Sequence, residues 1–184
     1  MTRPDWVAGG DRRQIAAERI HRAATELVLA DGFDGLDIET LARRLHCSRA
    51  TVYRYAGGKA QIRDAVLMNL AGGVVADVRD AVDGLSGPER VITAIEVALD
   101  RIRSDPMSRL MHSAATAPGL GDLHSSPVLA RLAADLTGIT DDDPQAAQWV
   151  VRVVVSLAFW PTGDRRTEEM LLRRFVAPAF SSRS

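Results

Sequence analysis

The sequence predicts an all-α fold, and three observations support this prediction. Apolar residues recur in several segments at i, i+3, i+4 and i+7, the spacing that places them on one face of a helix. Four of the eight prolines directly follow a residue suited to cap a helix, which is typical of proline at the first helical position. No glycine-bounded segment shows the alternating pattern of a half-buried strand. With 184 residues, 46% of them hydrophobic, the chain can bury a sizeable core.

The first expected helix begins at Asp11. Residues 1–10 contain Pro4 and two glycines without a helical period, so we expect a flexible arm there. Asp11 can cap the helix, and apolar residues with helical spacing follow. Gly32, which can adopt the left-handed conformation, is expected to end it, with Phe33 packing against its last turn.

Two short helices are expected next. Asp37 can cap the first, whose inward residues would be Ile38, Leu41, Ala42 and Leu45. His46 and Cys47 form a tight turn, and Ser48 can cap a second helix over residues 49–55 with Val52 and Tyr55 inward. Two short helices joined by such a turn form a helix-turn-helix, in which the small Ala42 allows a close crossing. The polar side of the second helix is free to enter a major groove.

The remaining chain is predicted to be helical as well. Helix starts are marked by the pairs Gly87-Pro88, Asp105-Pro106, Ser126-Pro127 and Asp143-Pro144. The β-branched residues between Val150 and Val155 would also suit a strand, but about sixteen residues lie between Pro144 and Pro161, which favours a helix over 144–160. Since this helix is apolar on nearly every side, we expect it to be buried in a core or a subunit interface. A last helix is expected over 164–177.

Charge is unevenly distributed along the chain. The formal net charge is −1, yet residues 40–63 contain six basic residues and no Asp or Glu. This segment therefore carries +6 and the other 160 residues carry −7. Both tyrosines, Tyr53 and Tyr55, lie in the same segment, and tyrosine hydroxyls with arginines are suited to phosphate contact. A solvated helix face is the alternative explanation of such a basic run.

Other classes of protein find little support in the sequence. A single cysteine, Cys47, allows no internal disulfide, and no stretch has the ~20 apolar residues of a membrane span, so we expect a cytoplasmic protein without a membrane partner. The four histidines show no metal-ligand spacing. No glycine-rich phosphate loop or nucleophile elbow is present. We therefore expect no enzyme activity, catalytic residue, metal or cofactor.

Residues 12–67 resemble the tetracycline-repressor (TetR) family of bacterial regulators. The most specific part is the run from Leu41 to Tyr55, LARRLHCSRATVYRY, followed by Lys59. Three positions depart from the family pattern: His46 replaces the usual turn glycine, Ala56 a phenylalanine, and Ala60 an acidic residue. The resemblance implies a helix-turn-helix DNA-binding domain over residues 11–57 and a ligand-binding and dimerisation domain over 58–184.

The resemblance also implies roles for individual residues. Those expected to contact double-stranded DNA are Arg43, Arg44, Ser48, Arg49, Ala50, Thr51, Tyr53, Arg54 and Lys59. Among them Arg49, Ala50 and Thr51 would face base edges, and Tyr53, Arg54 and Lys59 would bind phosphates. One of Arg43 and Arg44 would reach the backbone. Tyr55 and Cys47 are expected to pack rather than bind.

Candidates in the second domain follow from its apolar segments. Residues that could line a ligand pocket or simply close the core are Met107, Leu110, Met111, His112 and Trp149. Residues expected in a dimer interface are Val150, Val154, Leu157, Leu171, Leu172 and Phe175. The sequence thus predicts a homodimeric, ligand-responsive regulator that acts as a repressor, with an unidentified small-molecule effector. The alternative is a helical interaction or ligand-carrier module whose basic segment binds an acidic protein.

Overall fold

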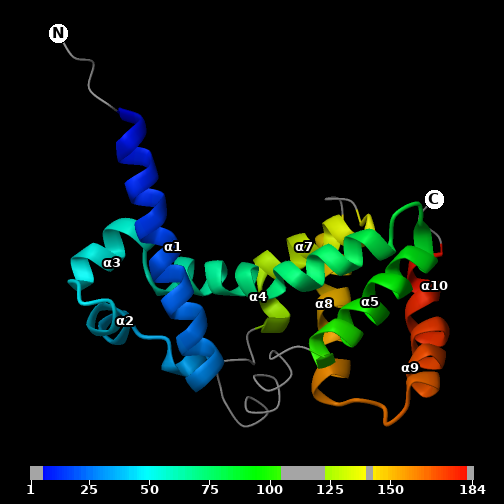
Figure 1. Ribbon diagram of the computed structural model, residues 1–184. Coiled ribbons are helices and arrows are strands. Elements are labelled where there is room, and N and C mark those ends of the chain that lie inside the picture. Colours follow the sequence, from blue (N-terminus) through cyan, green and yellow to red (C-terminus); the bar gives the residue numbers. More distant parts are fainter. Residues whose placement is uncertain (1–5, 105–122, 140–142, 182–184) are drawn as a thin grey trace. The chain divides into compact units, whose positions relative to one another are not determined.

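The structure is a computed structural model that describes residues 6–104, 123–139 and 143–181 (Figure 1). All regular secondary structure in these ranges is helical, which confirms the all-α prediction. The chain divides into two compact units, Met1–Asn69 and Leu70–Ser184. The division falls inside a long helix, whereas the sequence placed the domain boundary at residues 57 and 58, where that helix begins. No helix in the described ranges is long and apolar enough to cross a membrane.

The first unit is built around helix α1. It contains α1 (Trp6–Asp31), η1 (Phe33–Gly35), α2 (Ile38–Arg44), α3 (Arg49–Ala56) and the beginning of α4 (Lys59–Ala81). Helix α1 packs against both α2 and α3 (Figure 1). The core of this unit is made of apolar side chains, the most completely buried being Ala24, Val28, Leu36, Leu41, Val52, Ile62 and Val66. Every element of the unit contributes to this core, so the two short helices are fixed against a rigid support.

Helix α1 begins earlier than the sequence predicted. Residues Trp6 to Gly10 are helical, although the sequence indicated an arm over residues 1–10 and a helix start at Asp11. An established helix gains one hydrogen bond for each residue added, which offsets the roughly 1 kcal/mol that each glycine costs relative to alanine. At the other end α1 stops at Asp31, as expected, and Phe33 is buried. Gly32 has φ 75° and ψ 177°, a region that glycine alone adopts readily, rather than the left-handed helical one.

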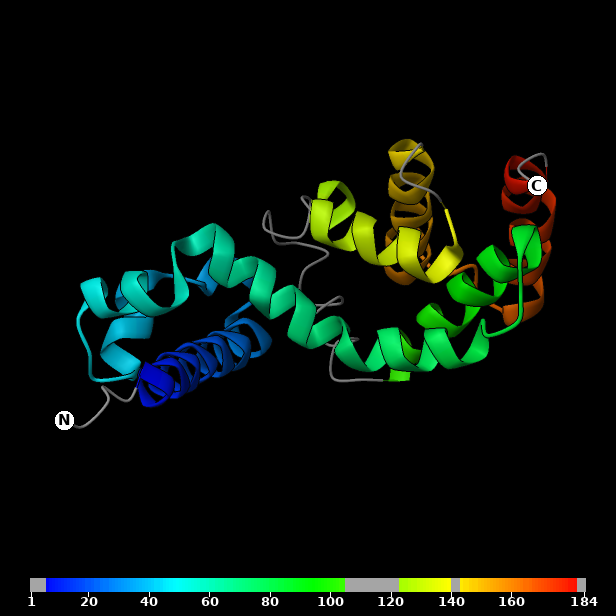
Figure 2. The same ribbon diagram turned by 90° about the horizontal axis from the view of Figure 1, so that it is seen from above.

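The second unit is a set of packed helices. Beyond the end of α4 it contains α5 (Gly87–Ser104), η3 (Leu123–Ser125), α7 (Pro127–Thr137), α8 (Pro144–Phe159), α9 (Arg165–Leu171), η4 (Leu172–Val176) and α10 (Ala177–Phe180). Helix α8 packs on α7 and α5, and α10 also packs on α5 (Figure 2). The expected helices over 144–160 and from Asp164 onward are therefore present, with α8 ending at Phe159.

Local capping explains where these helices begin. The Ser126 side chain accepts a hydrogen bond from the backbone N–H of Leu129, and Asp143 accepts one from Ala146. Both residues precede a proline, as the sequence predicted, and Asp164 caps α9 through the N–H of Thr167. Helix α5 begins at the Gly87-Pro88 pair. The Asp105-Pro106 pair lies outside the described residues.

The last helix continues past the point at which the sequence predicted its end. Pro178 was expected to stop it at residue 177, because proline lacks an N–H and its ring collides with the preceding turn. Instead, residues Leu172–Val176 form a wider π-helical turn, in which the N–H of Ala177 bonds to the carbonyl of Leu172. The chain then remains helical to Phe180, whose side chain is 5% exposed. Burial of Phe180 stabilises the additional turn.

Candidate nucleic-acid interface

The first helix of the interface, α2, is fixed at its start by Asp37. The Asp37 carboxylate accepts hydrogen bonds of 3.0 Å from the backbone N–H groups of Glu39 and Thr40. The bond from Thr40 is the main cause that lowers the pKa of Asp37 below its ordinary value. A lowered pKa means that this cap stabilises the folded unit above the unfolded-state pKa, and that the stabilisation is lost as pH falls through the lower folded value. The predicted cap is confirmed.

The turn between α2 and α3 depends on His46. Its φ is 52°, and among the described residues it alone combines a side chain with a positive φ. This finding agrees with the sequence, in which His46 occupies the position where the family usually has glycine. The next residue, Cys47, donates its N–H to the carbonyl of Ala42 at 2.9 Å, which closes the turn. Ala42 is 5% exposed, so a small side chain is required where the two helices meet.

Helix α3 presents one apolar and one polar side. Ser48 caps it, because the Ser48 hydroxyl accepts a 3.1 Å bond from the N–H of Thr51 and lies 2.9 Å from the Thr51 hydroxyl. Val52 is fully buried and Ala56 is 8% exposed, whereas Tyr55 is half-buried. The exposed side chains of this helix are Arg49, Ala50, Tyr53 and Arg54, with Thr51 partly exposed. The expected outward face of α3 is therefore free of contacts with the core.

Two glycines join α3 to α4 and bring Tyr53 close to the start of α4. Gly57, with φ 80°, donates its N–H to the Tyr53 carbonyl, and the N–H of Gly58 bonds to the Gln61 side chain. A Cβ on Gly58 would lie 3.8 Å from the Tyr53 ring, so this ring passes beside the connection. Lys59, the first residue of α4, is exposed. The exposed Tyr53 thus lies beside the connection that leads to the exposed Lys59.

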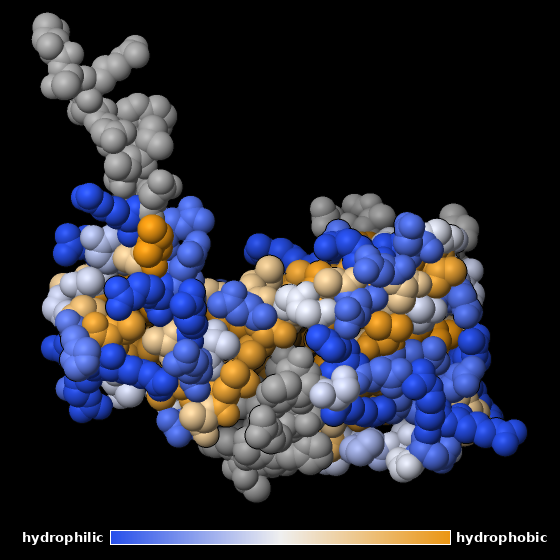
Figure 3. Space-filling view, viewed as in Figure 1, coloured by the Kyte–Doolittle hydropathy of each residue, from blue (hydrophilic) through white to orange (hydrophobic). Residues whose placement is uncertain are grey.

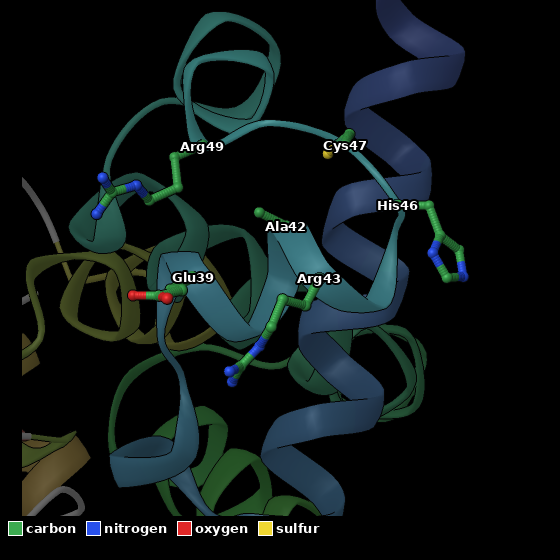
Figure 4. Close-up of a pocket in the computed structure, with 6 residues that line it drawn as sticks. All are labelled: Glu39, Ala42, Arg43, His46, Cys47 and Arg49. Carbon is green, nitrogen blue, oxygen red and sulfur yellow. The ribbon is translucent and has the colours of Figure 1, made fainter.

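The structure distinguishes the two neighbouring arginines of α2. Arg44 pairs with Glu26 of α1 at 2.8 Å, so its guanidinium is held against α1. Within the ranges that the structure describes, Arg43 bonds only to the Thr40 hydroxyl of its own helix. A surface hollow of about 580 Å³ between α2 and α3 is lined by Glu39, Ala42, Arg43, His46, Cys47 and Arg49. In Figure 4 Glu39, Arg43 and Arg49 extend from the two helices on one side, and His46 points the other way.

The predicted pocket residues lie mostly beyond what the structure describes. Met107, Leu110, Met111 and His112 fall outside the described residues, and Trp149 on α8 is 47% exposed. The sequence did not indicate a second hollow, of about 660 Å³, between α7 and α8, whose apolar lining includes Ala130, Ala134, Ile139 and Ala147. The feature of the sequence that could have indicated this hollow is the pair of small residues at positions 130 and 134, one helical turn apart. Such an alanine pair is, however, equally typical of close packing between helices.

The predicted dimer residues separate into two groups. Val150 and Leu172 are 3% and 1% exposed, so both are buried within their own chain and have little surface for a partner. Val154, Leu157 and Leu171 are half-buried, and Phe175 is 63% exposed. Two further apolar side chains are exposed, Trp160 and Met170. Within the single chain, helix α8 is therefore buried on one side only, and not on nearly every side. Figure 3 shows apolar surface between the polar side chains of this unit.

No group of three or more side chains suited to hold a metal ion is found in the described ranges. The arrangement is instead an exposed, basic helix-turn-helix, α2 and α3, packed on α1, and a second, helical unit follows it in the chain. These features define a DNA-binding regulator of the helix-turn-helix class.

Comparison with known proteins agrees with this class. Residues 20–66 match the family described as bacterial regulatory proteins, tetR family. Two HTH-type transcriptional regulators of Mycobacterium tuberculosis, MT1294 of strain CDC 1551 / Oshkosh and Rv1255c of strain ATCC 25618 / H37Rv, are each 29% identical over 188 residues, covering 97% of this chain and 91% of theirs. The chain therefore carries the helix-turn-helix domain of the TetR family, a family of transcriptional regulators rather than enzymes.

Two solved structures share the fold. The TetR-family transcriptional repressor QsdR of R. erythropolis superimposes with a TM-score of 0.61 at 20% identity, over 90% of this chain and 94% of QsdR. The repressor AlkX of Dietzia sp. strain DQ12-45-1b, implicated in biodegradation of n-alkanes, gives a TM-score of 0.52 at 18% identity, over 87% of this chain and 94% of AlkX. The fold that the resemblance implied, an N-terminal helix-turn-helix domain and a helical C-terminal domain, is confirmed.

Proposed function

We propose that the protein is a homodimeric, ligand-responsive repressor that binds a near-palindromic operator. The observation that carries this proposal is the outward side of α3, where Arg49, Ala50, Tyr53 and Arg54 are exposed on a helix fixed from behind by the buried Val52. Two solved structures of the same fold, QsdR and AlkX, are those of repressors, which supports the repressor form of the proposal.

Base recognition is assigned to the first turn of α3. Arg49 can bind a guanine edge bidentately, and the methyl groups of Ala50 and Thr51 can meet a thymine methyl. Because the Thr51 hydroxyl is engaged with the Ser48 hydroxyl, the Thr51 methyl is the part of the side chain left for the groove. Ser48 then acts mainly as the helix cap.

Phosphate binding is assigned to the basic residues around this turn. Tyr53, Arg54 and Lys59 are exposed on one side of it, and Arg43 on the other. Arg43 is preferred to Arg44 for direct contact, because leaving Glu26 would cost Arg44 an ion pair. Arg44 therefore contributes positive charge rather than a contact. Such phosphate contacts orient the protein on the duplex without reading its sequence.

Dimerisation is assigned to the exposed apolar side of α8 and to α9 with η4. Trp149 and the half-buried Val153 lie one turn apart on α8, the exposed Trp160 directly follows its end, and Met170 and Phe175 are exposed on the last helix. Single exposed apolar residues are ordinary on a protein surface, whereas two tryptophans, a phenylalanine and a methionine on neighbouring segments are typical of an interface. A two-fold axis there would place two copies of α3 about 34–36 Å apart, one turn of the duplex.

Ligand response is assigned to the second unit. The hollow between α7 and α8 is a candidate for the effector, since α8 also carries the proposed dimer surface. The dimer can adopt conformations that differ in the distance between its two DNA-binding units. An effector that binds one of these conformations more tightly would increase the population of that conformation.

Selection of bound duplexes from a random pool tests the proposal most directly. A dyad-symmetric consensus with half-sites one helical turn apart is the expected result. Enrichment of no sequence at all would contradict the proposal and favour the alternative, a module that binds an acidic protein.

Replacing Arg49 with alanine is expected to change sequence preference more than overall affinity. Loss of a bidentate contact removes about 1–3 kcal/mol of discrimination at one base pair of each half-site. Repeating the selection with the Arg49→Ala variant measures this effect as relaxed preference at one symmetric position. A uniform loss of affinity with the consensus unchanged would instead make Arg49 a phosphate contact.

Replacing Trp149 with glutamate is expected to separate the protomers. The change buries an unpaired charge in the proposed interface, for which about 3 kcal/mol, or more than a hundredfold in the dimer dissociation constant, is the expected cost. Sedimentation velocity of the Trp149→Glu variant measures it. Met68→Glu is the matched control, because Met68 on α4 is 46% exposed, close to the 47% of Trp149. Equal dissociation of the wild-type and Trp149→Glu proteins would contradict this interface.

A further inference from the structure

We infer that the first turns of α1 form a second DNA-contacting element, in which Arg12 and Arg13 bind backbone phosphates flanking the base pairs read by α3. The match to the family starts at residue 20, whereas α1 starts at Trp6, so Trp6–Arg19 form a helical extension upstream of the matched segment. We call these residues the α1 extension. The inference rests on the proposed DNA-binding function and adds a contact site to it.

The described side chains of the α1 extension take no part in the core. The first buried residue of α1 is Ile20, and none of the side chains from Arg12 to Arg19 is buried. Ile15 is 56% exposed. In Figure 1 the dark blue end of α1 extends beyond α3. Within residues 12–19 only Ala16 and Ala17 are half-buried, so few tertiary contacts support this segment, and a helical segment of this length depends on such contacts for stability. A binding partner would supply those contacts.

The charge of the α1 extension indicates what kind of partner this is. Arg12, Arg13 and Arg19 are exposed, and the only acidic residue between 12 and 19 is Glu18, which accepts a hydrogen bond from Gln14. Arg12 makes no ion pair or hydrogen bond within the described part of the chain. With Asp11 included, the α1 extension carries +1, and its residues 12–19 carry +2, the same sign as the basic segment 40–63. The α1 extension and the basic segment 40–63 would therefore both attract a polyanion, whereas the acidic remainder of the chain would repel it.

The position of Arg13 relates this charge to the recognition helix. The Arg13 guanidinium donates to the carbonyl of Arg54 at 3.5 Å, which places it at the C-terminal end of α3. The base-reading residues occupy the opposite end, and eight residues of helix span about 12 Å. A guanidinium has five N–H donors, so Arg13 can hold the end of α3 and still bind a phosphate. The phosphate it reaches lies outside the base pairs that α3 reads.

The experiment compares the salt dependence of binding for charge-matched variants on the selected duplex. Each lost phosphate contact should reduce the slope of log affinity against log salt concentration by about 0.9. For Arg12→Gln/Arg13→Gln we expect a reduction of about 2 per protomer, with the consensus sequence unchanged. Arg131→Gln/Arg166→Gln, which removes two exposed arginines of the second unit, is the control and should leave the slope unchanged. Circular dichroism verifies that each variant is folded.

Duplex length provides the second measurement. Trimming the duplex on both sides to the consensus should weaken binding of the wild-type protein about tenfold or more and change the Arg12→Gln/Arg13→Gln variant by less than about threefold. A slope equal to that of the control variant overturns the inference. So does a loss confined to Arg13→Gln with an unchanged slope, which would make Arg13 only a cap of α3. If the wild-type protein selects no duplex, the proposed DNA-binding function itself is wrong. That outcome differs from the two results above, in which the wild-type protein binds its duplex and only the role of Arg12 and Arg13 is refuted.

Discussion

A Tyr53→Phe/Lys59→Gln double variant is expected to bind every duplex at least about a hundredfold more weakly than the wild-type protein. Tyr53 is 55% exposed and its ring lies beside the connection that leads to Lys59, so both groups can meet the same stretch of backbone. A hydrogen bond to a charged group contributes about 1.5–3 kcal/mol, and two such contacts are removed from each protomer. Since phosphates carry no sequence information, the loss should be uniform across sequences. Titration of labelled duplexes, specific and unrelated, measures it.

The second tyrosine provides the control for this variant. Tyr55 is half-buried on the inner side of α3, and the Arg54 guanidinium lies 5.4 Å from its ring centre. Tyr55→Phe should therefore change DNA affinity by less than about threefold, because no phosphate contact is assigned to it. If Tyr53→Phe/Lys59→Gln binds as tightly as Tyr55→Phe, the phosphate assignments for Tyr53 and Lys59 are wrong.

A Glu168→Ala variant is expected to lose about 3 kcal/mol of the free energy of unfolding. Glu168 is 5% exposed, and its carboxylate accepts two bonds from Arg103 of α5, at 2.6 and 3.0 Å. Arg103 also donates to the carbonyl of Leu157 near the end of α8, so one guanidinium joins three helices. The hydrogen bonds to Glu168 are the main cause that raises the pKa of Arg103 above its ordinary value. Removing the carboxylate leaves a half-buried cation without its partner.

Denaturant unfolding at one fixed protein concentration measures this loss, because the stability of a dimer depends on concentration. Glu168→Gln, which keeps the shape and one acceptor, should lose about half as much. The neighbouring Glu169 provides the matched control: its pair with Arg173 is exposed on both sides, so Glu169→Ala should cost at most about 0.5 kcal/mol. Similar losses for Glu168→Ala and Glu169→Ala would contradict the assignment of Glu168 as a buried structural ion pair.

Features that depend on neighbours in sequence were predictable. Asp37, Ser48, Ser126, Asp143 and Asp164 each cap the helix that the sequence assigned to them, because a cap bonds to an N–H two or three residues away. His46 adopts the positive φ expected at the turn, and the basic segment 40–63 lies on the helix-turn-helix. The motif from Leu41 to Tyr55 was specific enough to indicate the family.

Features that depend on distant partners were not predictable. The preference for Arg43 over Arg44 rests on Glu26, 18 residues away, and the Arg103–Glu168 pair joins residues 65 apart. Burial of Phe180 supports the last helix beyond Pro178, although the local pattern predicted an end there. Val150 and Leu172 looked like interface residues until the packing of α5, α7 and α10 showed them buried in one chain.

The sequence by itself determined the class of fold, the helix starts, the helix-turn-helix and the concentration of positive charge on it, because short-range hydrogen bonds and helical periodicity specify these. Only the tertiary structure decided that Arg44 pairs with Glu26, which side of α8 remains exposed, and that Arg13 of the α1 extension lies at the C-terminal end of α3. Those properties arise when separate helices pack, and packing brings together residues whose spacing in the sequence carries no sign of the contact.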